Sequence, residues 1–107
     1  MSENPRIKAL RAMLDRNPDD PRVHFGLAAE YEKLELWDAV VEELQQYLGL
    51  TEDEGNAWGR LGNALRHAGR ESESREAYEK GIDAARRHGH PTMALEFREI
   101  LDAESAP

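Results

Sequence analysis

Apolar residues recur every three or four positions along most of the chain, which is the period of an α-helix with one buried face. The first such stretch follows Asn4 and Pro5, an N-cap and a proline at the first helical position, and should end at Asn17. No window alternates with the period of two that is typical of strands. The pattern therefore predicts an all-α fold of about six helices, the later ones covering 21–34, 37–48, the segment ending at Gly69, 71–87 and 92–103.

Three predicted helix ends depend on particular residues. Gly49 is expected to end the helix that precedes it, since glycine is common just after a helix. Thr51 and Glu54 have the spacing of a capping box, which would start the next helix. Gly69 suits the left-handed conformation that often closes a helix.

The chain also resembles itself when it is shifted by 34 residues. The matched residues are Leu27 with Leu61, Ala28 with Gly62, Tyr31 with Leu65, Leu44 with Tyr78, and Leu48 with Ile82. A helix-turn-helix unit of about this length resembles the tetratricopeptide repeat (TPR), whose pattern begins W-x2-L-G-x2-Y. In the second copy this pattern reads Trp58, Leu61, Gly62 and Leu65, and in the first copy it reads His24, Leu27, Ala28 and Tyr31.

The resemblance implies a right-handed solenoid of antiparallel helix pairs in a single domain, 1–107. We expect a half repeat at 5–18, full repeats at 21–54 and 55–88, and a capping helix at 91–104. A cap is expected because the last unit of such a stack must turn one face to water.

Composition narrows the possible functions. Asp and Glu total 22 against 14 Lys and Arg, a formal charge of −8, and such a field repels nucleic acids. There is no cysteine, no nucleophile-elbow serine, and no third ligand beside His88 and His90. We therefore expect a protein that is not an enzyme and that uses no cofactor, metal or nucleic acid.

The location follows from the same kind of reading. No stretch approaches the ~18 consecutive apolar residues of a membrane span, and the first ten residues lack the apolar segment of a signal peptide. We expect an acidic cytoplasmic protein without membrane contact.

A glycine- and arginine-rich stretch, 57–70, interrupts this acidic chain. It lacks the lysine-hydroxyl pair and the preceding strand of a phosphate-binding loop. Gly62 is better interpreted as the point where the paired helices approach most closely, which leaves the basic residues to be explained.

In the resemblance to TPR proteins, the first helix of each pair lines a concave groove. The groove positions are Arg22, Phe25, Ala29, Lys33, Asn56, Arg60, Asn63, Arg66 and His67. Family members that hold the C-terminal carboxylate of a peptide use asparagine and basic side chains here, and Asn63 falls at a matching place. Gly26 and Gly59 are expected to let a ligand approach the helix backbone.

Two functions stay open at this point. The first is a protein-interaction module or adaptor that binds a peptide segment of a partner in the groove, with basic residues attracting acidic groups or a C-terminal carboxylate. The second is a self-assembling scaffold or homodimer with no groove ligand, in which the final helix, or Leu36 and Trp37, pairs with another copy.

Overall fold

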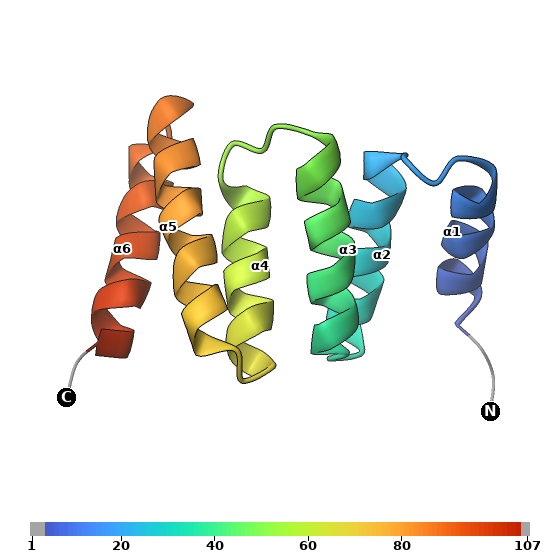
Figure 1. Ribbon diagram of the computed structural model, residues 1–107, viewed down its shortest axis with the longest axis horizontal. Helices are drawn as coiled ribbons and strands as arrows, with labels where there is room; N and C mark the ends of the chain where they lie inside the picture. Colours follow the sequence, from blue (N-terminus) through green and yellow to red (C-terminus); the bar gives the residue numbers. More distant parts are fainter. Residues whose placement is uncertain (1–3, 106–107) are drawn as a thin grey trace. The chain divides into compact units, whose positions relative to one another are not determined.

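The computed structural model describes residues 4–105, and within them it contains six helices and no strand. Figure 1 shows α1 (Pro5–Arg16), α2 (Pro21–Lys33), α3 (Trp37–Leu50), α4 (Asn56–His67), α5 (Glu71–Arg87) and α6 (Pro91–Ser105). The all-α prediction is confirmed. The chain forms two compact units that divide after Thr51, so that α1 to α3 belong to the first unit and α4 to α6 to the second.

In the first unit, α2 packs against α1 and α3. Its N-cap is Asp20, whose carboxylate accepts a hydrogen bond from the backbone of Arg22, and Pro21 takes the first helical position. Leu27 of α2 and Leu44 of α3 are fully buried, as the helical spacing predicts. The apolar stripe of α2 therefore forms the centre of this unit.

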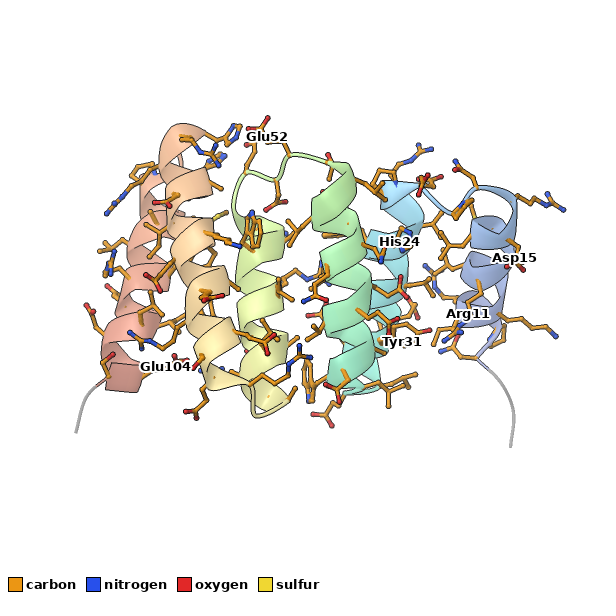
Figure 2. All side chains as sticks on the ribbon, viewed as in Figure 1. Arg11, Asp15, His24, Tyr31, Glu52 and Glu104 are labelled. Carbon is orange, nitrogen blue, oxygen red and sulfur yellow. The ribbon has the colours of Figure 1, made fainter. Side chains whose placement is uncertain are left out.

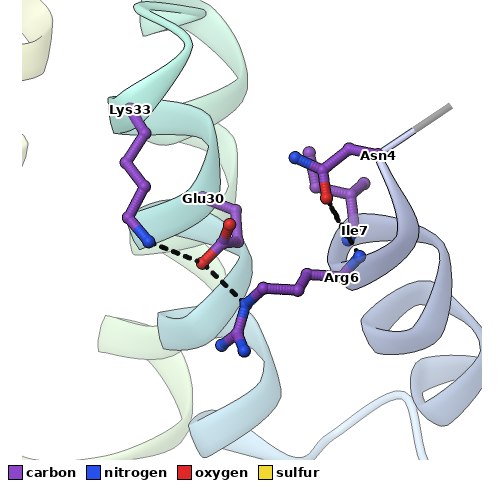
Figure 3. A network of polar contacts seen from close by, with 5 residues as sticks. All are labelled: Asn4, Arg6, Ile7, Glu30 and Lys33. Atoms are coloured by element: carbon purple, nitrogen blue, oxygen red, sulfur yellow. Dashed lines mark hydrogen bonds and ion pairs between the residues drawn. The ribbon is translucent and has the colours of Figure 1, made fainter. Parts of the chain in front are cut away.

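A buried carboxylate joins α1 to α2. Glu30 accepts a hydrogen bond from Arg6 Nε at 3.1 Å and one from Lys33 Nζ at 3.2 Å (Figure 3). The hydrogen bond from Lys33, and then that from Arg6, hold the pKa of Glu30 below its ordinary value. Arg11 adds a second link, since its guanidinium donates to the Tyr31 hydroxyl, toward which it points in Figure 2.

In the second unit, α5 packs against both α4 and α6. The helices α4 and α5 approach closely at Gly62, where an added Cβ would lie 2.7 Å from the ring of Tyr78. The buried Ser74 hydroxyl donates to the Gly62 carbonyl at 2.7 Å. The interpretation of Gly62 as a packing residue is thus confirmed.

The same turn links the two helices in each pair, α2 to α3 and α4 to α5, at positions 34 residues apart. Gly69 has φ 79°, and the amide of Arg70 donates to the Leu65 carbonyl at 2.8 Å. Glu35 takes the corresponding place with φ 55°, and the amide of Leu36 donates to the Tyr31 carbonyl at 3.1 Å. The predicted left-handed Gly69 is confirmed, while the first repeat places a side chain in the same conformation.

Two predicted helix ends between α3 and α4 are wrong. Gly49 does not end α3, which continues to Leu50, because a glycine with helical dihedrals interrupts no hydrogen bond. Thr51 is the extended C-cap of α3 and cannot also begin α4.

The start of α4 is set by Asp53 instead of a capping box. The Asp53 carboxylate accepts from the backbone amides of Gly55 at 2.8 Å and Ala57 at 2.9 Å. Gly55, with φ 127°, turns the chain into the helix, and Glu54 pairs with His90. Because of this positive φ, α4 begins at Asn56, after the capping box that was predicted at Thr51 and Glu54.

A buried histidine fixes the start of α2. His24 stands where the second repeat has Trp58, and it is 6% exposed. Its Nδ1 lies 2.7 Å from Glu43 of α3, and its Nε2 lies 2.7 Å from the Pro18 carbonyl, to which it can only donate. Burial lowers the pKa of His24, but the Glu43 and Pro18 contacts outweigh burial and raise it overall.

We expect Glu35→Gly to raise the free energy of unfolding by up to about 1 kcal/mol, because glycine adopts a positive φ without the clash of a Cβ atom. Gly69→Ala should lower the same quantity by roughly 1 kcal/mol. Urea denaturation of both variants and the wild type measures the two changes. A lower free energy of unfolding for Glu35→Gly together with a higher one for Gly69→Ala would contradict the assignment of these turns.

Stability should depend on pH through His24. Because its pKa is raised in the folded state, its contribution is fully present below about pH 6.5 and is lost as the pH rises through the folded value. The free energy of unfolding, measured from pH 5.5 to 8.5, should decline more steeply in the wild type than in Glu43→Gln. Parallel profiles would show that Glu43 does not stabilise the imidazolium.

Candidate functional site

Three of the predicted site residues meet near the C-terminal end of α4. Arg66 donates a hydrogen bond to the side-chain oxygen of Asn63 at 3.0 Å, and its other terminal nitrogen lies 3.7 Å from Glu104 of α6. His67 Nδ1 lies 2.9 Å from the Asn63 carbonyl, so this nitrogen carries the proton. Because the Asn63 oxygen accepts from Arg66, its amide nitrogen keeps two donors for another partner.

The other two residues of α4 continue the same stripe. Asn56 is exposed at the helix start, and Arg60 is half-buried one turn later. Burial lowers the pKa of Arg60, but a guanidinium stays protonated near neutral pH. The stripe of Asn56, Arg60, Asn63 and His67, with Arg66 beside it, therefore presents mainly hydrogen-bond donors; we call these five residues the α4 face.

The predicted residues of α2 lie in the first unit and show a different environment. Arg22 is highly exposed and lies 3.6 Å from Asp20, while Lys33 is held by Glu30. Phe25 is half-buried with its ring 4.9 Å from that of Tyr47. Ala29 is half-buried as well. The apolar residues thus support packing within the unit, and each of the two cations has a carboxylate near it.

Sequence reasoning missed the carboxylates that face these cations. Glu30 and Glu104 are distant in the sequence from Arg6 and Arg66 respectively, so only tertiary packing brings each pair together. The helical periodicity of the sequence could have placed Glu30 on the inner face of α2, but it could not have identified Arg6 as the partner. The basic surface expected from residue counts is therefore partly neutralised by the chain's own acids.

The two glycines that were expected to admit a ligand are in contact with other helices. An added Cβ at Gly59 would lie 2.4 Å from Phe97 of α6, and one at Gly26 would lie 3.5 Å from Leu10 of α1. The expectation for Gly59 is wrong, because an aromatic side chain of the same chain already occupies this position. The close approach that glycine permits here is one between helices.

No family model matches the chain. A curated relative, TPR repeat-containing protein PA0015 of Pseudomonas aeruginosa, is 33% identical over 97 residues, which cover 89% of this chain and 90% of that protein. The chain belongs to the tetratricopeptide repeat family. A second TPR relative, small glutamine-rich tetratricopeptide repeat-containing protein 2 of Mycosarcoma maydis, is 31% identical over 77 residues; the match covers 72% of this chain but only 22% of that longer protein.

A solved structure agrees with the TPR assignment. The solution structure of protein BPP2914 from Bordetella parapertussis is 28% identical to this chain and superposes with a TM-score of 0.75. The superposition covers 96% of this chain and 88% of that one. The similarity therefore extends over nearly the full length of both.

Two residues depart from the TPR repeat pattern, and their contacts account for both. The second helix of the TPR pattern reads A-x3-F, and Ser74 stands at its alanine, where the hydroxyl donates to the Gly62 carbonyl. His24 replaces the first tryptophan and uses its ring nitrogens to bind Glu43 and Pro18. Each polar side chain is buried with its hydrogen bonds made, so neither is a candidate catalytic group.

The two histidines before α6 lie near acids of the segment before α4, although only His90 makes a hydrogen bond to its acid. His88 lies 3.5 Å from Glu52, and His90 lies 2.6 Å from Glu54. Among residues 4–105 no group of three or more His, Cys, Asp or Glu side chains is arranged to hold a metal ion. Nor does any helix in this described range combine the length and apolar character needed to cross a bilayer.

Gly59→Ala should lower the free energy of unfolding by about 1–3 kcal/mol, because the new methyl group and the Phe97 ring cannot both keep their places. The cost should shrink when Phe97 is also replaced by alanine, and denaturation of the double-mutant cycle measures this coupling. Gly49→Ala is the control: its Cβ meets nothing within 4 Å, so it should raise stability by ~0.5–1 kcal/mol. A Gly59→Ala variant as stable as the wild type would contradict this packing role.

Proposed function

We propose that this TPR protein is a protein-interaction module that binds a peptide segment of a partner on the α4 face, and that it has no catalytic activity of its own. Its TPR relatives support a repeat protein of this kind, and the donor-rich α4 face supplies the chemistry for binding a peptide. We also propose that it lies in the cytoplasm. Cytosolic proteins rarely contain disulfides, and this chain has no cysteine to form one.

One observation carries the choice of ligand. Arg66 already holds the carboxylate of Glu104 at 3.7 Å while it donates to Asn63. A partner's carboxylate, from an acidic side chain or a C-terminus, would take the place of Glu104 and accept from both Arg66 and the Asn63 amide nitrogen. Two donors of this kind, one of them charged, recognise a carboxylate better than a neutral acceptor.

The remaining residues of the α4 face would extend the contact. Arg60 lies on the same side of α4 as Asn63 and would attract a further acidic group, and His67, whose Nδ1 proton goes to the Asn63 carbonyl, would contact the peptide through Nε2. Asn56, exposed one turn before Arg60, would bond the peptide backbone. We further propose that Arg22, Phe25, Ala29 and Lys33 of α2 form a contact surface of their own in the first unit, with Phe25 and Ala29 supplying its apolar part.

The proposal is tested by affinity capture from lysate of the native cell with the wild type and the double variant Asn63→Ala, Arg66→Glu. Asn63 is half-buried, Arg66 is exposed and neither belongs to the buried core, so the variant should fold. We expect a partner that the wild type captures and the variant loses, and its captured segment should then bind as a synthetic peptide. Arg87→Glu, an exposed charge reversal on α5, is the control and should capture normally. Equal capture by all three proteins would reject the α4 face.

Removing the internal carboxylate should strengthen binding. We expect Glu104→Gln to raise the affinity for an acidic peptide by up to about fivefold, the value of a partly exposed ion pair. Glu99→Gln makes the same charge change on an exposed part of α6 and should leave the affinity unchanged. Fluorescence polarisation with a labelled acidic peptide measures both. Equal gains in the two variants would indicate a general charge effect and no competition at Arg66.

A further inference from the structure

The first and last helices each pack through one side and expose the other. In α1 the inward residue Ile7 is buried, whereas Ala9, Ala12 and Met13 on the far side are exposed, Met13 to 51%. In α6 the inward residues Ala94 and Leu101 are buried. The outward stripe of α6 contains Leu95, exposed to 58%, together with the exposed acids Glu99 and Asp102.

The two exposed helices have opposite charge. Pro5–Arg16 contains four basic residues and one acidic residue, while Pro91–Ser105 contains four acidic residues and one basic residue. Arg6 is paired with Glu30, and Glu104 is paired with Arg66, so one charge of each helix is used within the chain. The remaining charges are Lys8, Arg11, Arg16 and Asp15 on α1, and Glu96, Glu99, Asp102 and Arg98 on α6. A net surplus of two positive charges on α1 thus corresponds to a surplus of two negative charges on α6.

The order of the helices gives these two ends complementary roles. The helices α2 and α3 form one pair, and α4 and α5 form the next. In this alternation α1 takes the place of a second helix without its first, and α6 that of a first helix without its second. The exposed side of α1 is thus one that a first helix would cover in a complete pair, and the exposed side of α6 is one that a second helix would cover.

We propose that α6 of one copy docks against α1 of another copy, so that the two unpaired helices complete a helix pair between chains. The exposed Leu95 would contact the Ala9, Ala12 and Met13 face, and Glu99 and Asp102 would pair with Lys8 and Arg16. The partner is thus a second copy of this chain. Because none of these residues belongs to the α4 face, this proposal is independent of peptide binding.

The charges decide between the possible symmetries of such an association. Contact between two α1 helices, or between two α6 helices, would bring like charges together, and this disfavours a two-fold symmetric dimer through either end. Contact between α1 and α6 joins unlike surfaces and is therefore heterologous, which gives rings or open chains of copies. Two helix faces bury less area than the ~1,600 Å² of a standard interface, so the association should be weak and sensitive to salt.

Charge reversal at each end provides a direct test. The first variant carries Lys8→Glu and Arg16→Glu, which leaves both ends acidic; the second carries Glu99→Lys and Asp102→Lys, which leaves both ends basic. Sedimentation from micromolar to millimolar concentration, at low ionic strength, should show self-association of the wild type that high salt weakens. Each variant alone should associate at least about tenfold more weakly, and an equimolar mixture of the two should recover association, because each acidic end then meets a basic one.

The controls separate this contact from other modes of assembly. Glu79→Lys with Asp83→Lys makes the same charge change on exposed positions of α5 and should associate as the wild type does. Circular dichroism establishes that every variant is folded. A wild type that stays monomeric at millimolar concentration and low salt would overturn the proposal. So would association that persists in both end variants, as expected for a contact through Leu36 and Trp37, or a mixture that fails to recover it.

Discussion

The close approach of helices at small residues is the constraint on which the second unit depends. At Gly62 the backbone of α4 lies against the Tyr78 ring of α5, and at Gly59 it lies against the Phe97 ring of α6. The two rings are themselves 5.6 Å apart and form part of one apolar cluster. Glycine is needed at both places because a Cβ atom would force an aromatic ring out of a densely packed core.

Ion pairs with carboxylates fix the positions of several cationic side chains. Glu30 is buried and accepts from Arg6 and Lys33, and Glu104 lies beside Arg66. Where a cation is already paired within the chain, as Arg66 is with Glu104, an acidic partner would have to replace one carboxylate with another. Such exchange changes specificity more than affinity, because a partly exposed ion pair is worth little by itself.

Much of the fold could be predicted from the sequence, because helix periodicity and turn residues are local signals. Asn4 and Gly69 acted as the caps that their residue types favour, and Gly62 marked a close contact within a helix pair. The prediction failed where two local signals competed. Thr51 had the spacing of a capping box, but the neighbouring Gly55 and Asp53 set the helix start instead.

The sequence by itself determined the all-α class, the repeat of 34 residues and the family, since these follow from the spacing of apolar residues and turns. Tertiary structure alone decided which residues face one another. It placed Phe97 on Gly59, Glu104 beside Arg66 and Glu43 beside His24, pairs that are at least 19 residues apart in the sequence. No local pattern encodes such contacts, because they depend on how whole helices pack.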